Sequence, residues 1–174
     1  IGSIQGGTTG NVIPELVNMI GTIRSNNEDI RQSILKDLPT LIEHNAQAND
    51  VTAKVEIAPY APVTSNDKTL TKLMQPALAQ VNGEGKLHVL DSNASASEDF
   101  AYYGQLMPSL FIFIGATQSD QDMSKAAPNH SPLFTVDDAT LKTGIESHMR
   151  FVMEYPKAAA QVQNAWQRKQ SPAK

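Results

Sequence analysis

Apolar positions in the first third of the chain form two short runs and then recur at helical spacing. The runs at 1–5 and 16–24 are rich in apolar and β-branched residues, and a glycine-rich stretch at 6–10 separates them, which predicts two strands and a turn. A Ser/Asn-rich capping segment then precedes apolar residues at helical spacing, which predicts a helix over about 28–47. Pro39 lies inside this helix and is expected to kink or divide it.

The next segment, 51–58, alternates apolar and polar residues and predicts a third, half-buried strand. The order strand, strand, helix, strand is typical of an α+β unit in which one helix covers one face of an antiparallel sheet. The stretch 59–67 is rich in Pro, Thr, Ser and Asn, and we interpret it as a linker between two parts of the chain.

Helices and strands alternate in the second part, which predicts an α/β layer on a mainly parallel sheet. The predicted helices lie at 67–82, 97–105 and 137–155, and the predicted strands at 87–90 and 110–114. The run 110–114 is continuously apolar and typical of a strand buried on both faces. So few strands cannot form a sheet alone, and we expect upstream sequence to supply the others. The tail from Lys157 is expected to fray or to add one helical turn.

Composition narrows the classes of function. The 174 residues suffice for one domain core or two small ones, and the net charge of −4, with no basic cluster before the last few residues, argues against a nucleic-acid or anionic-membrane surface. No apolar run approaches the ~20 residues of a membrane-spanning helix. The absence of cysteine excludes disulfides and thiolate chemistry. Because the chain begins with Ile1 rather than methionine, we expect a segment upstream of it.

His130 is the residue best placed for chemistry. Pro128 and Pro132 flank it, and because proline fixes φ and restricts the residue before it, they should hold the imidazole on a stiff, non-helical loop. Such an imidazole suits a metal site or an acid–base site, although a loop histidine is more often a solvated side chain. The other histidines show no metal-binding spacing, and zinc needs three or four protein ligands, so this chain alone cannot build a metal site.

Two further sets of residues are candidates for binding. Asn11 lies in the turn before the second predicted strand and Arg24 at its end, and together a carboxamide and a guanidinium can hold a carboxylate or a carbonyl oxygen. The alternative is a turn asparagine and a surface arginine. Ser97 begins a predicted helix with two carboxylates in its first turn. Either the backbone N–H groups of the preceding loop approach a substrate anion, or the carboxylates only complement the helix dipole.

Four segments, taken together, resemble motifs of the zinc-dependent aminoacylase, hippurate hydrolase and auxin-conjugate amidohydrolase family of co-catalytic metallopeptidases. They are residues 6–14, 21–24, 96–100 and 128–134, in the family's order. Each is short, but four in register are specific, and they extend the resemblance to about residue 155.

The resemblance implies a mixed α/β (α+β) chain that forms part of a two-domain metallopeptidase fold. Residues 1–60 resemble the second half of a lid domain with an antiparallel sheet and a helix. Residues 61–155 resemble the C-terminal part of an α/β catalytic domain, and 156–174 form a tail. The exposed edge of a half lid sheet should promote self-association.

The resemblance also implies the roles of individual residues. His130 matches the C-terminal ligand of a centre with two divalent metal ions. The expected metal is zinc, and manganese, cobalt or nickel are the alternatives. Asn11 and Arg24 match lid residues that close over the substrate and bind its carboxylate, and Ser97 matches the loop that lines the substrate site. The other ligands and the general-base glutamate are expected upstream of Ile1, so no catalytic residue lies in this chain.

The implied activity is hydrolysis of the amide bond of N-acyl amino acids or dipeptide-like substrates by a longer enzyme. The implied assembly is a homodimer through the lid, with neither a nucleic-acid nor a membrane partner. We expect the 174-residue chain alone to be inactive. A periplasmic or secreted bacterial location is favoured, with the cytoplasm as the alternative. The competing hypotheses are a non-catalytic dimerisation or interaction module of a metal-free relative, and a small α+β domain with chance motif matches.

Overall fold

The chain forms two compact units in a computed structural model that describes residues 1–58, 60–81, 83, 85–90 and 98–171. The first unit is Ile1–Val63, and the second begins at Thr64 and contains the C-terminal helix. The boundary falls inside the segment 59–67. The chain is a mixed α/β chain, as predicted.

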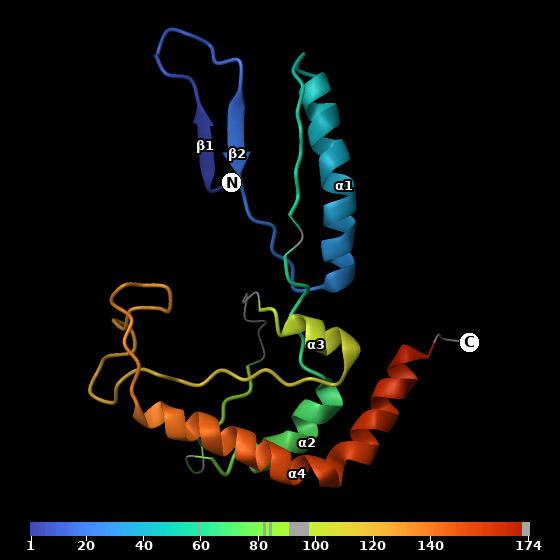
Figure 1. The fold of residues 1–174 in the computed structure, drawn as a ribbon, viewed down its shortest axis with the longest axis vertical. Helices are drawn as coiled ribbons and strands as arrows, with labels where there is room; N and C mark the ends of the chain where they lie inside the picture. The colour runs from blue at the N-terminus through green and yellow to red at the C-terminus, as the bar shows by residue number, and fades with distance from the viewer. Residues whose placement is uncertain (59, 82, 84, 91–97, 172–174) are drawn as a thin grey trace. The chain divides into compact units, whose positions relative to one another are not determined.

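The first unit begins with an antiparallel hairpin of β1 (Ser3–Gly6) and β2 (Val17–Ile20), which confirms both predicted strands at four residues each (Figure 1). Ser3 pairs with Ile20, and Gly6 pairs with Val17. A Cβ on Gly6 would lie 2.8 Å from Val17 Cγ2, so the close approach of the two strands requires glycine there.

Helix α1 (Glu28–Gln47) has the predicted bounds. Asn27 caps it, because its side-chain oxygen accepts a hydrogen bond from the Ile30 N–H at 3.0 Å. Pro39 was predicted to kink or divide the helix; the helix runs through it without interruption, so the division is wrong.

The segment 51–58 is not a strand, which corrects the prediction. The segment begins with a hydrogen bond to α1 rather than to a sheet, since the Val51 N–H donates to Ala46 O at 3.1 Å. Five residues beyond its end, the Val63 N–H donates to Glu28 Oε2 at 3.0 Å. The expected alternation survives as partial burial of every second residue. Among the described residues α1 makes no packing contact with the hairpin, so the helix does not cover the sheet as predicted. The returning segment runs alongside α1 instead (Figure 1).

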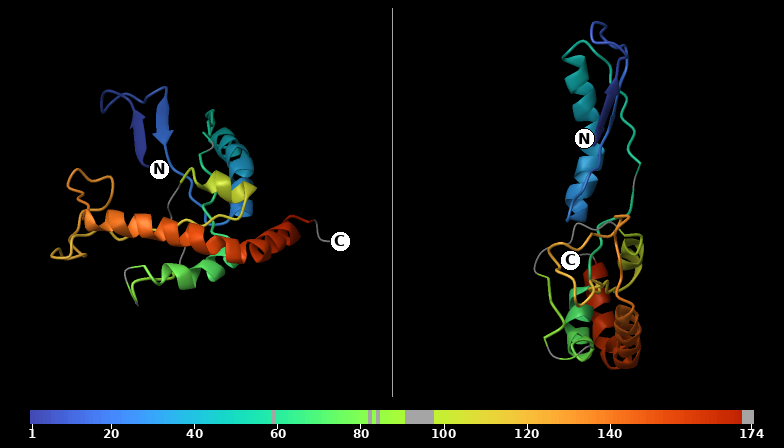
Figure 2. Two further views of the ribbon diagram at one scale, coloured as in Figure 1. Left: turned by 60° about the horizontal axis from the view of Figure 1, so that its bottom comes forward. Right: turned by 90° about the vertical axis from the view of Figure 1, so that its left-hand side faces the viewer.

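The second unit is built on two helices, α2 (Lys68–Leu78) and α4 (Ala139–Gln170), which pack against each other (Figure 2). Asp67 caps α2 by accepting a hydrogen bond from the Leu70 N–H at 2.8 Å. The core cluster takes residues from both helices: Leu70, Met74, Leu78, Ala158 and Val162.

Helix α4 is much longer than predicted and continues past Pro156 to Gln170. The expectation of a frayed tail after Lys157 is wrong. Ala158 and Val162 are 7% and 0% exposed, so burial against α2 stabilises the helix where local sequence gave little signal.

Helix α3 (Ala101–Leu106) confirms the short predicted helix, although it begins later than predicted. The described residues from 64 onward contain no strand, so the predicted strands at 87–90 and 110–114 are not observed. Phe113 is 59% exposed, which is at odds with burial on both faces. A strand requires a partner, and no described segment supplies one here.

No helix in the described ranges is both long enough and apolar enough to span a bilayer.

Candidate functional site

His130 lies in the loop that leads into α4, the gold-to-orange segment of Figure 1. The base of this loop is closed by the Asp137 N–H, which donates to Ala116 O at 2.9 Å. Closer to His130, the Ser131 N–H donates to Pro128 O at 3.1 Å, and the Phe134 N–H donates to Ser131 O at 3.0 Å. Backbone hydrogen bonds therefore constrain the chain on both sides of the histidine.

His130 itself has a φ of 71°, one of two non-glycine residues in the left-handed region among those described. This conformation is unusual for a residue with a Cβ, and histidine is among the residues that adopt it more readily. The loop around His130 is non-helical, as predicted. The His130 side chain is exposed, so its ring nitrogens are accessible to a ligand.

The same loop carries Asp122, which is exposed and folded back on its neighbour. Its Oδ1 accepts hydrogen bonds from the Ser124 hydroxyl at 2.8 Å and the Ser124 N–H at 2.9 Å. These bonds favour the charged form and lower the pKa of the Asp122 carboxyl. They complete a local turn.

A metal site is not complete in the described part of the chain. No three His, Asp or Glu side chains come together there in an arrangement that could hold an ion. Exposed His130 could supply one nitrogen donor to such a site, and the other donors would come from outside the described residues.

Asn11 and Arg24 are both exposed in the first unit, and they lie beyond opposite ends of β2. Asn11 lies in the loop that connects Gly6 to Val17, at one end of the hairpin. Arg24 follows Ile20, which pairs with Ser3 at the other end. The hairpin register therefore does not bring the two side chains together within one chain. Ser97 lies outside the described residues.

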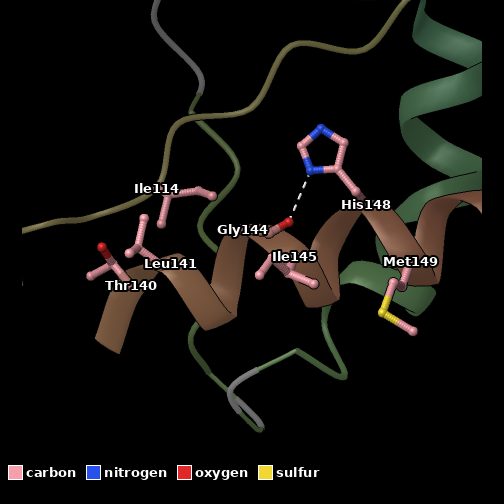
Figure 3. A pocket seen from close by; sticks show the side chains of 7 residues that line it. All are labelled: Ile114, Thr140, Leu141, Gly144, Ile145, His148 and Met149. Atoms are coloured by element: carbon pink, nitrogen blue, oxygen red, sulfur yellow. Dashed lines mark hydrogen bonds between the residues drawn. The ribbon is translucent and has the colours of Figure 1, made fainter. Parts of the chain in front are cut away.

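An open apolar depression on α4, shown in Figure 3, was not predicted from the sequence. It is lined by seven residues of the second unit: Ile114, Thr140, Leu141, Gly144, Ile145, His148 and Met149. His148 Nδ1 lies 2.9 Å from Gly144 O, one turn earlier in the same helix. The depression is apolar apart from Thr140 and this ring, so it lacks the convergent polar groups of a catalytic pocket.

Comparisons with known proteins agree on one family. Residues 5–154 match peptidase family M20/M25/M40. The N-acetyl-L-cysteine deacetylase of Bacillus subtilis is 33% identical over 142 residues, covering 81% of this chain and 32% of that protein. The IAA-amino acid hydrolase ILR1-like 4 of Arabidopsis thaliana is 29% identical over 159 residues, covering 89% of this chain and 36% of that protein.

A solved structure agrees with the sequence comparisons. The Bacillus subtilis YXEP protein, described as a dinuclear metal-binding peptidase from the M20 family, superposes with a TM-score of 0.66 at 26% identity, covering 86% of this chain and 39% of that one. The chain spans about a third of the length of the curated relatives it matches. The family resemblance seen in the four motifs is confirmed, and the chain belongs to peptidase family M20/M25/M40.

Proposed function

We propose that the chain is part of a longer metal-dependent amidohydrolase that cleaves the amide bond of N-acyl amino acids or dipeptide-like substrates. The observation that carries this proposal is the family match over residues 5–154, which includes Asn11, Arg24 and His130. Relatives named as deacetylases of N-acetylcysteine and N-acetyldiaminopimelate support an acylated amino acid as the substrate class.

In this proposal His130 is one nitrogen donor to a centre of two divalent metal ions, zinc or alternatively manganese, cobalt or nickel. Its exposed ring on a constrained loop supports the role, since a ligand held in place loses little freedom on binding. The remaining donors and the general-base glutamate come from the part of the enzyme outside this chain. When bound, the metal ions polarise the amide carbonyl and lower the pKa of a bound water.

The chain's own residues bind and orient the substrate in this proposal. The Arg24 guanidinium offers two parallel N–H groups to the substrate carboxylate, and the Asn11 carboxamide offers an N–H to a carbonyl oxygen. We assign them separate contacts because they lie beyond opposite ends of β2. Ser97 remains a proposed contact from the loop that lines the substrate site.

Homodimerisation through the first unit is also part of the proposal. Ile4, Met19 and Ile20 of the hairpin are 64%, 60% and 67% exposed, and the described residues add no third strand to β1 and β2. An exposed apolar hairpin with two unpaired edges is a surface that associates. The same feature favours the second candidate function, a dimerisation module of a metal-free relative. Metal ligands in the rest of the gene product support the enzyme, and their loss supports the module.

The test compares His130→Ala with His44→Ala in the longer protein. His44 is an exposed histidine on α1, far along the chain from the proposed ligand, and serves as the matched control. We expect the His130 variant to lose bound metal by elemental analysis and to lose hydrolysis of N-acetyl amino acids, while the control keeps both. The 174-residue chain alone should give no turnover with added zinc or manganese. Turnover by this chain, or normal metal content in the His130 variant, contradicts the proposal.

A further inference from the structure

His130 is the third residue of a β-turn. The Ser131 N–H donates to Pro128 O at 3.1 Å, which is the hydrogen bond from the fourth residue of such a turn to the first. Asn129 and His130 are the two central residues, and His130 has a φ of 71°. Turns that require a positive φ at the third residue favour glycine or asparagine there. Histidine therefore occupies a position at which the turn itself favours another residue.

The left-handed backbone of His130 carries a steric cost. Histidine adopts this region more readily than most residues, but only glycine, which has no Cβ, occupies it without that cost. Packing does not account for the histidine either, because its side chain is exposed. A residue that is strained and packs on little is a candidate for function, since neither the turn nor the core explains its side chain.

Ser131 joins this turn to a second one. Its N–H closes the first turn, and its carbonyl oxygen accepts from the Phe134 N–H at 3.0 Å, which begins a turn through Pro132 and Leu133. Its Oγ accepts from the Leu133 N–H at 3.2 Å, a local bond that reinforces the second turn. Ser131 is half-buried, whereas His130 beside it is exposed. The serine therefore fixes the backbone directly after the histidine.

A fixed backbone at this point bears on ligand binding. The φ and ψ of a residue set the direction of its Cα–Cβ bond, so the turn that closes at Ser131 also aims the His130 side chain. A side chain already held in its bound direction loses less conformational freedom when it binds. Metal sites in particular depend on neighbours that orient their ligands.

We propose that Ser131 is a positioning residue for His130. By closing one turn and beginning the next, it holds the histidine in the left-handed conformation that presents the imidazole to a metal ion. The histidine is kept at this position for its side chain, at a cost in stability that glycine would avoid. The inference rests on the proposed function in taking His130 as a metal ligand, whereas the strain of the turn is independent of it.

The strain is tested by comparing His130→Gly with His130→Ala in the 174-residue chain. At an ordinary negative φ alanine stabilises a protein more than glycine, because glycine loses more freedom on folding, and at a positive φ the order reverses. We therefore expect the glycine variant to have a Tm several degrees above that of the alanine variant. An equal or higher Tm for His130→Ala overturns the strained turn.

His148 provides the matched control for this comparison. It is an exposed histidine inside α4, in the same unit, where the backbone is helical. Here the alanine variant should have the higher Tm, because glycine is unfavourable in a helix. The opposite order at positions 130 and 148 assigns the effect to the backbone of His130 and not to the loss of an imidazole.

The role of Ser131 is tested by titrating the metal-depleted longer protein with zinc. We expect Ser131→Ala to weaken zinc binding by about 10- to 100-fold, the range typical of residues that orient a metal ligand, and Ser131→Thr, which keeps a hydroxyl, to restore it. Ser124→Ala is the matched control. Ser124 lies in the same loop, and its hydroxyl also makes a local hydrogen bond, to Asp122 Oδ1 at 2.8 Å. This variant should keep its zinc affinity.

The outcomes separate this inference from the proposed function. Unchanged zinc affinity in Ser131→Ala overturns the positioning role, and so does an equal loss in Ser124→Ala, which would indicate a general loosening of the loop. A longer protein that binds neither zinc nor manganese refutes the proposed function and with it the role of Ser131. The order of glycine and alanine at position 130 still decides in that case whether the turn is strained.

Discussion

The Val63 N–H donates a hydrogen bond to Glu28 Oε2 at 3.0 Å. Glu28 is the first residue of α1, and Val63 is the last residue of the first unit. The same carboxylate accepts from Arg31 Nη1 at 2.8 Å and from Gln32 Nε2 at 2.7 Å. Arg31 Nη2 in turn donates to Tyr60 O at 3.0 Å. The first turn of α1 therefore holds the last residues of the unit, directly before the boundary that follows Val63.

This cluster predicts a pH-dependent stability. Burial by itself raises the pKa of Glu28, but the hydrogen bonds from Val63, Gln32 and Arg31, with the Arg31 charge, outweigh it and hold the pKa below its ordinary value of 4.5. A carboxyl with a lowered folded pKa stabilises the fold at pH above its unfolded pKa, and that contribution is lost as the pH falls through the folded pKa. Glu28→Gln should therefore destabilise the first unit by about 1–2 kcal/mol at pH 7.

Denaturant unfolding at pH 7 and pH 3 checks this prediction, with Glu43→Gln as a control on an exposed position of α1. The stability difference between the Glu28 variant and the parent protein should be smaller at pH 3 than at pH 7, because protonation of Glu28 removes the same charge as the pH falls toward its lowered folded pKa. A loss of equal size at both pH values would show that the charge of Glu28 is not what holds Val63.

Asn66 provides a second prediction, because one side chain makes both hydrogen bonds to Phe111. Asn66→Ala removes both and should destabilise the second unit by about 1–3 kcal/mol. Asn66→Asp keeps the acceptor for the Phe111 N–H but places a carboxylate oxygen near the Phe111 carbonyl, so at pH 7 it should restore no more than part of that loss. Full stability of the aspartate variant in a thermal melt would contradict the two-way pairing.

Helix starts could be predicted from the sequence because their signals are local. Asn27 and Asp67 each accept a hydrogen bond from the N–H three residues later, and both cap a helix near its predicted start. The strands predicted at 51–58 and 110–114 are not observed, because the signal for a strand is not local. Alternation shows which side chains share a face, but a strand also requires a partner, and partners are set by distant segments.

In the candidate site, too, local features could be predicted from the sequence, whereas the spatial relations between distant residues could not. The two prolines around His130 predict a non-helical loop, which is observed, but proline restricts only itself and the residue before it, so the left-handed backbone of His130 could not be predicted from them. The four ordered motifs were sufficient to identify the family. That Asn11 and Arg24 lie beyond opposite ends of one strand depends on the hairpin register, which spacing along the chain does not reveal.

The C-terminal half of α4 should be indispensable to the second unit. Ending the chain after residue 155 removes Ala158 and Val162, which complete the core against α2. Loss of the fully buried Val162 side chain alone is worth about 1.5–3 kcal/mol. We expect the shortened chain to lose the cooperative unfolding transition of this unit, whereas a chain that ends after Arg168 keeps it. Circular dichroism melts of the two shortened chains distinguish a core element from a dispensable tail.

Arg24 gives a prediction specific to the substrate. If its guanidinium binds the substrate carboxylate, Arg24→Ala in the longer enzyme removes hydrogen bonds to a charged group worth about 1.5–3 kcal/mol, which corresponds to a rise in KM of roughly 10- to 100-fold. Arg24→Lys should recover only part of this, because an ammonium cannot form the two parallel hydrogen bonds of a guanidinium. The test measures kcat and KM for an N-acetyl amino acid and for its carboxamide, with the C-terminal Arg168→Ala as control. Arg24 binds the carboxylate only if the variant weakens the acid and spares the carboxamide, since an equal loss on both substrates would show that Arg24 acts on the fold of the first unit.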